Sequence, residues 1–148
     1  MELEIDFAIK SKYSNYHDFY VQNLNIFKSF VRVFEIFIKK EKYQNSEISI
    51  DEDAKDKATI KFCGEKYQIS LFIDPADLNY ALILLAKINK DQLVKIGEVK
   101  VDKSENIIFP GNTIVLMKDN YEFNNAVLNF IISGILENAQ ERAAAGSC

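Results

Sequence analysis

Tryptophan is absent from this chain of 148 residues, and histidine, cysteine, proline and glycine are scarce. Two cysteines, Cys63 and Cys148, are too few for the disulfide framework of a small secreted protein. Five glycines leave little material for loops that cradle phosphate groups. The P-loop, dinucleotide-binding, zinc-protease and serine-hydrolase motifs do not occur, so the sequence predicts no cofactor.

Metal ligands and catalytic pairs are also sparse. His17 is the only histidine, and with Cys63 it cannot supply the three or four ligands of a usual zinc site. Residues 51–56 begin like a calcium loop, but Asp56 stands where the loop needs glycine and Phe62 where it needs glutamate. The sequence therefore predicts no catalytic residue and no metal site.

Charge and hydropathy exclude further classes. The net charge is −4 and no segment is basic, which argues against direct binding of nucleic acid. The longest apolar runs, 78–88 and 126–136, reach about half of the ~20 residues that span a bilayer. An acidic N-terminus lacks the pattern of a signal peptide, and we expect a cytoplasmic protein without membrane contact.

The first part of the chain changes from one periodicity to another. Residues 3–9 alternate apolar with charged side chains, which predicts a half-buried strand. Residues 11–14 are interpreted as a break, and 15–42 as a long helix whose apolar face is unusually wide. One stripe of that face is typical of core packing, whereas part of the second stripe could meet a partner protein. The second stripe consists of Phe19, Ile26, Phe30, Val33 and Phe37.

The middle of the chain indicates a meander of strands followed by a helix. A strand at 47–50, a polar loop at 51–56 and a hairpin turning at Gly64-Glu65 are expected, with Phe62 opposite Tyr67. The segment 74–89 is predicted to be a helix, because Asp74 can cap it and Pro75 suits its first position. Capping explains Asp74 and the nearby Asp77 more simply than a catalytic pair of carboxylates.

The last part predicts more strands and a final helix. A strand over 94–101 shifts its alternation at Gly97, where we expect a β-bulge. Apolar stretches at 107–109 and 113–117 are strand candidates, and Asp119 opens the last helix, in which Gly134 indicates a close crossing. The whole predicts one α+β domain over 1–142, an antiparallel sheet of five to six strands packed by three helices. Residues 143–148 are interpreted as a flexible tail or a cloning remnant.

These features favour a protein that acts by binding another protein. Surface aromatic side chains concentrate binding energy, and the acidic loop could steer approach to a basic target. The preferred hypothesis is a non-enzymatic inhibitor of the immunity or antitoxin kind, which covers a toxin or enzyme. The predicted acidic contacts, in addition to the second helical stripe, are Asp51, Glu52, Asp53 and Asp56.

Two alternatives remain open. The predicted order of elements, the length and the acidic charge resemble the small chaperones of type III secretion systems, which are dimers that wrap an extended effector segment. A homodimer would favour that alternative, and a monomer would favour the inhibitor. The other alternative is an enzyme whose site is built from scattered carboxylates, which no motif would reveal.

Overall fold

The computed structural model describes the backbone of residues 4–146. A long helix, α1 (Phe7–Glu41), leads into seven strands, and a second helix, α2 (Asn120–Gly146), follows them. The strands form one antiparallel sheet in chain order. Their bounds are β1 (Glu47–Ile50), β2 (Lys57–Phe62), β3 (Glu65–Asp74), β4 (Asp77–Asn89), β5 (Gln92–Asp102), β6 (Asn106–Phe109) and β7 (Thr113–Leu116).

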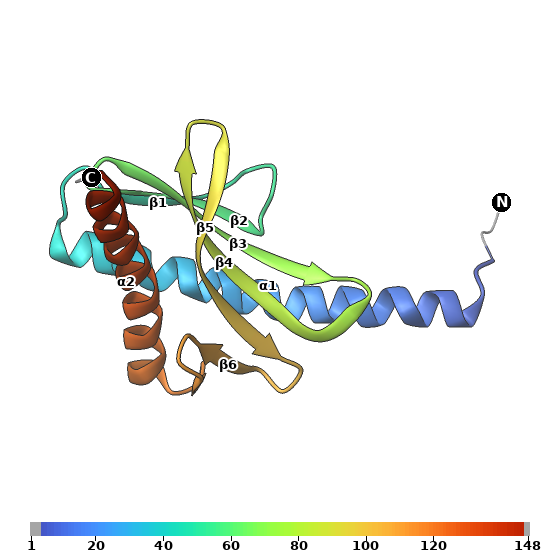
Figure 1. The fold of residues 1–148 in the computed structure, drawn as a ribbon. Coiled ribbons are helices and arrows are strands. Elements are labelled where there is room, and N and C mark those ends of the chain that lie inside the picture. The colour runs from blue at the N-terminus through green and yellow to red at the C-terminus, as the bar shows by residue number, and fades with distance from the viewer. Residues whose placement is uncertain (1–3, 147–148) are drawn as a thin grey trace.

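Both helices lie on one face of the sheet, and the other face carries no element of the described chain (Figure 1). α1 contacts β1, β3 and β4, whereas α2 contacts β4, β5 and β7 and crosses α1. This is a two-layer α+β architecture, in which each helix buries its apolar stripe against the inner face of the sheet.

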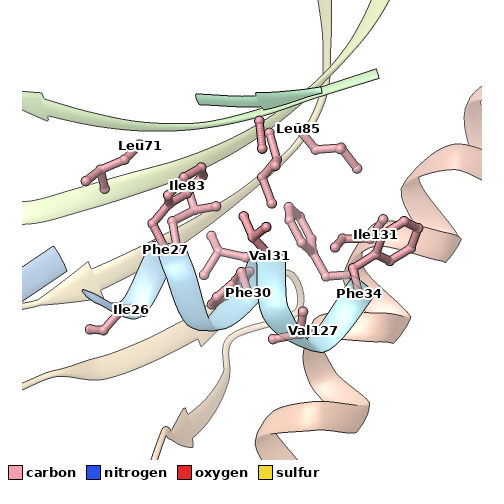
Figure 2. Close-up of a cluster of buried hydrophobic side chains, with 14 of the residues drawn as sticks. Ile26, Phe27, Phe30, Val31, Phe34, Leu71, Ile83, Leu85, Val127 and Ile131 are labelled. Atoms are coloured by element: carbon pink, nitrogen blue, oxygen red, sulfur yellow. The ribbon is translucent and has the colours of Figure 1, made fainter. Parts of the chain in front are cut away.

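The core lies between these two layers. Figure 2 shows Phe27 of α1 next to Ile83 of β4, and Ile131 of α2 next to Phe34 of α1. Phe27, Ile83 and Ile131 are fully buried. Successive residues of a strand point to opposite faces of the sheet. The side chains that point away from the helices therefore lie on the outer face.

Residues 4–9 do not form the strand predicted over 3–9. Residues 4–6 are irregular, Leu3 lies outside the described residues, and α1 begins at Phe7. The carboxylate of Asp6 accepts a hydrogen bond of 2.8 Å from the backbone N–H of Ala8, which caps the helix. The predicted break at 11–14 is also absent, because α1 runs through it without interruption.

The predicted helix at 74–89 is a strand. β4 pairs with β3 and β5 along most of its length, so its backbone hydrogen bonds go to neighbouring strands rather than along a helix. Asp74 accepts from the N–H of Ala76 and thereby closes a tight turn between β3 and β4, where the prediction had a helix cap. Residues 4–146 contain two helices instead of three and seven strands instead of five to six.

The other predicted elements are present. β1, β2, β3, β5, β6 and β7 correspond to the strands expected from the sequence, and the final helix starts next to Asp119. The hairpin register differs, because Phe62 pairs with Glu65 and the turn lies at Cys63-Gly64, both with positive φ. α2 continues to Gly146 and so takes in part of the segment interpreted as a tail.

Candidate protein-binding surfaces

Three members of the second helical stripe belong to the core. Ile26 and Phe30 are 1% and 0% exposed, and Phe19 is also buried. The ring of Phe30 lies between those of Phe109 at 5.9 Å and Phe123 at 5.5 Å. The wide apolar face of α1 therefore packs against both the sheet and α2, and only part of it reaches a surface.

The remaining members, Val33 and Phe37, are partly buried and line an open groove. The groove has a volume of about 1150 Å³ and is bounded by α1, the β5–β6 turn, the end of β7 and the start of α2. Ile26 contributes to its floor, as do Phe123 and Leu128 of α2. The structure thus brings three of the five predicted stripe residues to one concave apolar surface.

Charged side chains surround this apolar floor. Arg32 and Lys40 of α1 and Lys118 in the turn between β7 and α2 line the groove, together with Glu41 and Glu105. Among the residues that line the groove, three side chains are basic and two are acidic, although the chain as a whole carries a net charge of −4. A ligand segment that enters the groove therefore meets apolar contacts at the floor and a mainly basic rim.

The four predicted acidic contacts lie in the loop between β1 and β2, away from the residues that line the groove. Asp51, Glu52 and Asp53 are exposed, and the carboxylate of Asp51 accepts from the N–H of Asp53 at 3.0 Å. Asp56 is half-buried beside Tyr20 of α1. Partial burial raises the pKa of Tyr20, and the nearby Asp56 carboxylate, which accepts a hydrogen bond from the phenol, raises it further.

A second surface is the outer face of the sheet, and sequence reasoning missed it. Five outward side chains of β4 form an uninterrupted stripe, of which only the tyrosine has a polar group. Antiparallel sheets with one solvated face usually carry polar side chains there. Phe72 of β3 pairs with the stripe and is 51% exposed. The five stripe residues are Tyr80, Leu82, Leu84, Ala86 and Ile88.

The signal for this surface was the apolar run at 78–88, which is apolar on both faces of the strand. Ala81, Ile83 and Leu85 are buried in the core, while Leu82 and Leu84 point outward and are partly exposed. A run without period-two alternation suits a strand buried on both sides as well as a buried helix. The structure shows that only one side is covered by the described chain.

Residues considered for catalysis are dispersed. His17 is exposed on α1, where its ring stacks on Tyr13 with centroids 5.9 Å apart, and Cys63 is exposed in the β2–β3 turn. Asp74 and Asp77 each accept hydrogen bonds from their own turn. Among the described residues, no cluster of three or more His, Cys, Asp or Glu side chains is arranged to hold a metal ion.

The fold and these surfaces define an α+β protein with one antiparallel meander sheet, two helices on its inner face, and two uncovered apolar surfaces. Comparisons with protein-family models, curated proteins and solved structures find no match. Neither α1 nor the described part of α2 is long and apolar enough to cross a membrane.

Proposed function

We propose that this chain is a non-enzymatic protein-binding module, which acts as an inhibitor of the immunity or antitoxin kind by covering another protein. The single observation behind the proposal is the groove between α1 and α2, whose floor includes Ile26, Val33 and Phe37. Large side chains at the floor of a concave surface are the usual anchors of binding energy at protein interfaces.

The occupant that suits this groove is an amphipathic helix of the partner protein. Val33 and Phe37 are four residues apart on α1, and Ile26 lies two turns before Val33, so the floor runs along the helix for roughly 16 Å at 1.5 Å per residue. Helices commonly dock their apolar face into such grooves through anchors spaced by three, four or seven residues.

The rim adds a charge preference to this proposal. Arg32, Lys40 and Lys118 favour acidic side chains on the flanks of the docked helix. Glu41 and Glu105 reduce the preference without reversing it. The segment that enters the groove is therefore expected to be acidic, even if the remainder of the partner is basic and is steered by the chain's overall negative charge.

The chaperone alternative loses the element order on which the resemblance relied, because the helix expected after the third strand is β4. A role in wrapping extended segments stays a prediction that rests on charge and length alone. The groove favours a compact occupant, since it is bounded on several sides by helix, turn and strand.

A site-specific cross-linking experiment in cells of the native host tests the proposal. A photoreactive amino acid replaces Ile36, which lines the groove and is 52% exposed, or Ile9, which is 61% exposed on the same helix outside the groove. We expect one cross-linked product specific to position 36, mapped by mass spectrometry to an acidic amphipathic helix. Identical products at positions 36 and 9, or none at 36, would overturn the proposal.

A charge-reversed variant adds a second arm. Arg32→Glu places a negative charge on the rim without removing a core side chain. We expect it to weaken the position-36 cross-link about tenfold, since one close ion pair exchanged for repulsion at an interface is worth about 1.4 kcal/mol or more. An Arg32→Gln variant separates the loss of attraction from the added repulsion.

A further inference from the structure

One edge of β5 is open over most of its length. β5 pairs with β4 from Gln92 to Asp102, whereas β6 pairs with it only at Lys100 and Val101 (Figure 1). Successive residues of a strand direct their backbone hydrogen bonds to alternate sides. Within the described part of the chain, no strand pairs with the side of residues 92–99 that points away from β4. Some of the backbone N–H and C=O groups of this stretch therefore have no strand partner.

A second groove, with a volume of about 1040 Å³, opens at this edge and is called the β5 edge groove. Its lining includes Gly97, whose strand partner Leu85 is buried in the core, and Glu98, whose partner Leu84 points outward. Because residues directed to both faces of β5 line the groove, it lies at the edge of the strand and exposes the backbone groups there. The other walls are α2 and the turn between β6 and β7.

The walls of the β5 edge groove combine apolar and amide side chains. Phe109 of β6 and Phe130 of α2 are buried in the core, and Ile96, the bulged residue of β5, packs against the same core. Asn125 and Asn129 are exposed on the side of α2 that lines the groove. Amide side chains can donate to and accept from a peptide backbone. A chain laid along β5 therefore meets apolar contacts as well as hydrogen-bonding groups.

The charges that line the β5 edge groove cancel. Lys95 and Glu98 form an ion pair of 2.9 Å, and the ammonium group of Lys100 lies 5.8 Å from the centre of the Tyr80 ring on the outer face. Glu137 of α2 is the other charged residue of the lining, which thus has two basic and two acidic side chains. A neutral groove favours neither a phosphate backbone nor a strongly charged segment. Backbone hydrogen bonds and apolar contacts therefore select the occupant.

We infer that the β5 edge groove binds an extended, uncharged segment of another protein, which adds a strand to the sheet beside β5. Backbone groups at the spacing of a strand are matched by a second extended backbone, and strand addition is a common mode of peptide binding. Alternate side chains of the segment are apolar, because they face Phe109 and Phe130. The bulge at Ile96 and the neighbouring Lys95 hinder pairing with the edge of a second folded sheet, so a flexible segment fits better than a second copy. This groove shares no lining residue with the groove between α1 and α2.

Selection from a peptide library tests the inference. The probe is a phage-displayed library of random linear peptides of about ten residues, which is at least the length of most strands. We expect it to yield peptides with alternate apolar residues, and Asn129→Trp should weaken their binding at least about tenfold, because the indole fills the β5 edge groove from an exposed position. The matched control is Asn124→Trp, an exposed asparagine of α2 that lines the other groove, and it should leave binding unchanged. A selection that yields no peptide sensitive to Asn129→Trp would overturn the inference.

A backbone scan of a selected peptide separates strand addition from other modes of binding. Methylation of single peptide N–H groups should weaken binding about tenfold at every second residue, because only alternate amides of a strand point toward β5. The bound peptide should also slow hydrogen exchange of backbone amides within 92–99, as measured by NMR. An effect of methylation without this period of two, or a chain that dimerises through this edge and is made monomeric by Asn129→Trp, would contradict the inference. The cross-link at position 36 measures the proposed function independently, since it reports on the other groove.

Discussion

A Cβ atom added at Gly97 of β5 would lie 2.9 Å from Cε1 of Phe130 in α2. The strand therefore passes so close to the helix that a side chain at this position would force the ring of Phe130 to shift. Gly97 stands at the β-bulge of β5, where Leu85 pairs with Gly97 and the next residue, Ala86, pairs with Lys95. The bulge and the glycine together set how closely α2 approaches the sheet.

We predict that Gly97→Ala destabilises the fold by about 1–3 kcal/mol, because the ring of Phe130 is packed and cannot move freely away from the new methyl group. Urea denaturation of the wild type and the variant measures the difference. Phe130→Leu removes the ring atoms concerned, so the alanine should cost less in that background. Equal costs in the two backgrounds would show that the close contact is not the cause.

Alanine substitutions at Phe30 and at Ile9, both on α1, should differ sharply in their effect on the free energy of unfolding. Phe30→Ala is predicted to cost about 3–5 kcal/mol, since the side chain is 0% exposed between Phe109 and Phe123. Ile9→Ala is expected to change the free energy of unfolding by less than about 0.5 kcal/mol, since Ile9 is 61% exposed. Thermal or urea melts measure both changes, and similar losses would contradict the assignment of Phe30 to the core.

Local signals were enough to predict every described strand of the meander except β4. Alternation in β2 and β3, a glycine in the turn between them and the shifted pattern at Gly97 all act over a few residues. The faces were therefore correct: Ile60 and Ile69 are both buried, as a shared inner face requires. The register was displaced because the turn centres on Cys63-Gly64, and Cys63 adopts a φ of 51°, which few residues other than glycine favour.

The segment 77–89 could not be assigned from local signals. Asp74, Pro75 and Asp77 form a helix start as readily as a tight turn, and the apolar residues that follow suit either structure. Hydrogen-bonded pairing with β3 on one side and β5 on the other makes this segment a strand. This pairing depends on residues outside the segment, so the segment's own sequence does not reveal it. The outer apolar face was missed for the same reason, since it exists only when these residues form a strand.

The candidate groove was partly predictable. The width of the apolar face of α1 indicated that one layer could not cover it, and Val33 and Phe37 do reach a groove. The sequence could not separate them from Phe19 and Phe30, because burial there depends on where α2 crosses α1. The basic rim was also missed, since Lys118 joins Arg32 and Lys40 only through the fold.

Lys87 is the one charged side chain among the buried residues of the described chain. We expect that an apolar side chain of similar length can replace it with little loss of stability. Its ammonium group pairs with the carboxylate of Glu65 and lies 4.7 Å from the centre of the Tyr67 ring. We predict that Lys87→Met changes the free energy of unfolding by about 1 kcal/mol or less, because the apolar contacts of the stem remain and Glu65 is exposed enough to be hydrated. Lys87→Glu, which buries a negative charge beside Glu65, should cost several times more. Comparable urea midpoints for the two variants would contradict this account of the pair.

The turn between β5 and β6 should lose stability in acid. Partial burial on its own would raise the pKa of Asp102, but hydrogen bonds from the Asn106 side chain and from the N–H groups of Asn106 and Ser104 outweigh it and lower the pKa below the ordinary value of 3.8. A lowered pKa in the folded state means that the ionised carboxylate stabilises the fold above the unfolded-state pKa. This contribution is lost as the pH falls through the folded-state pKa. Wild type should therefore exceed Asp102→Asn in stability at pH 6, and the difference should narrow below pH 3.8.

The titration of Asp102 can be followed directly by NMR of its carboxyl carbon. The midpoint should lie below 3.8 in the wild type and move upward in Asn106→Ala, because that variant removes the side-chain amide that donates to Oδ2 at 2.9 Å. The two backbone donors remain, so the shift should be partial. A midpoint that does not respond to Asn106→Ala would assign the lowered pKa to the backbone of the turn alone. A midpoint above 3.8 in the wild type would remove the physical basis for the acid sensitivity.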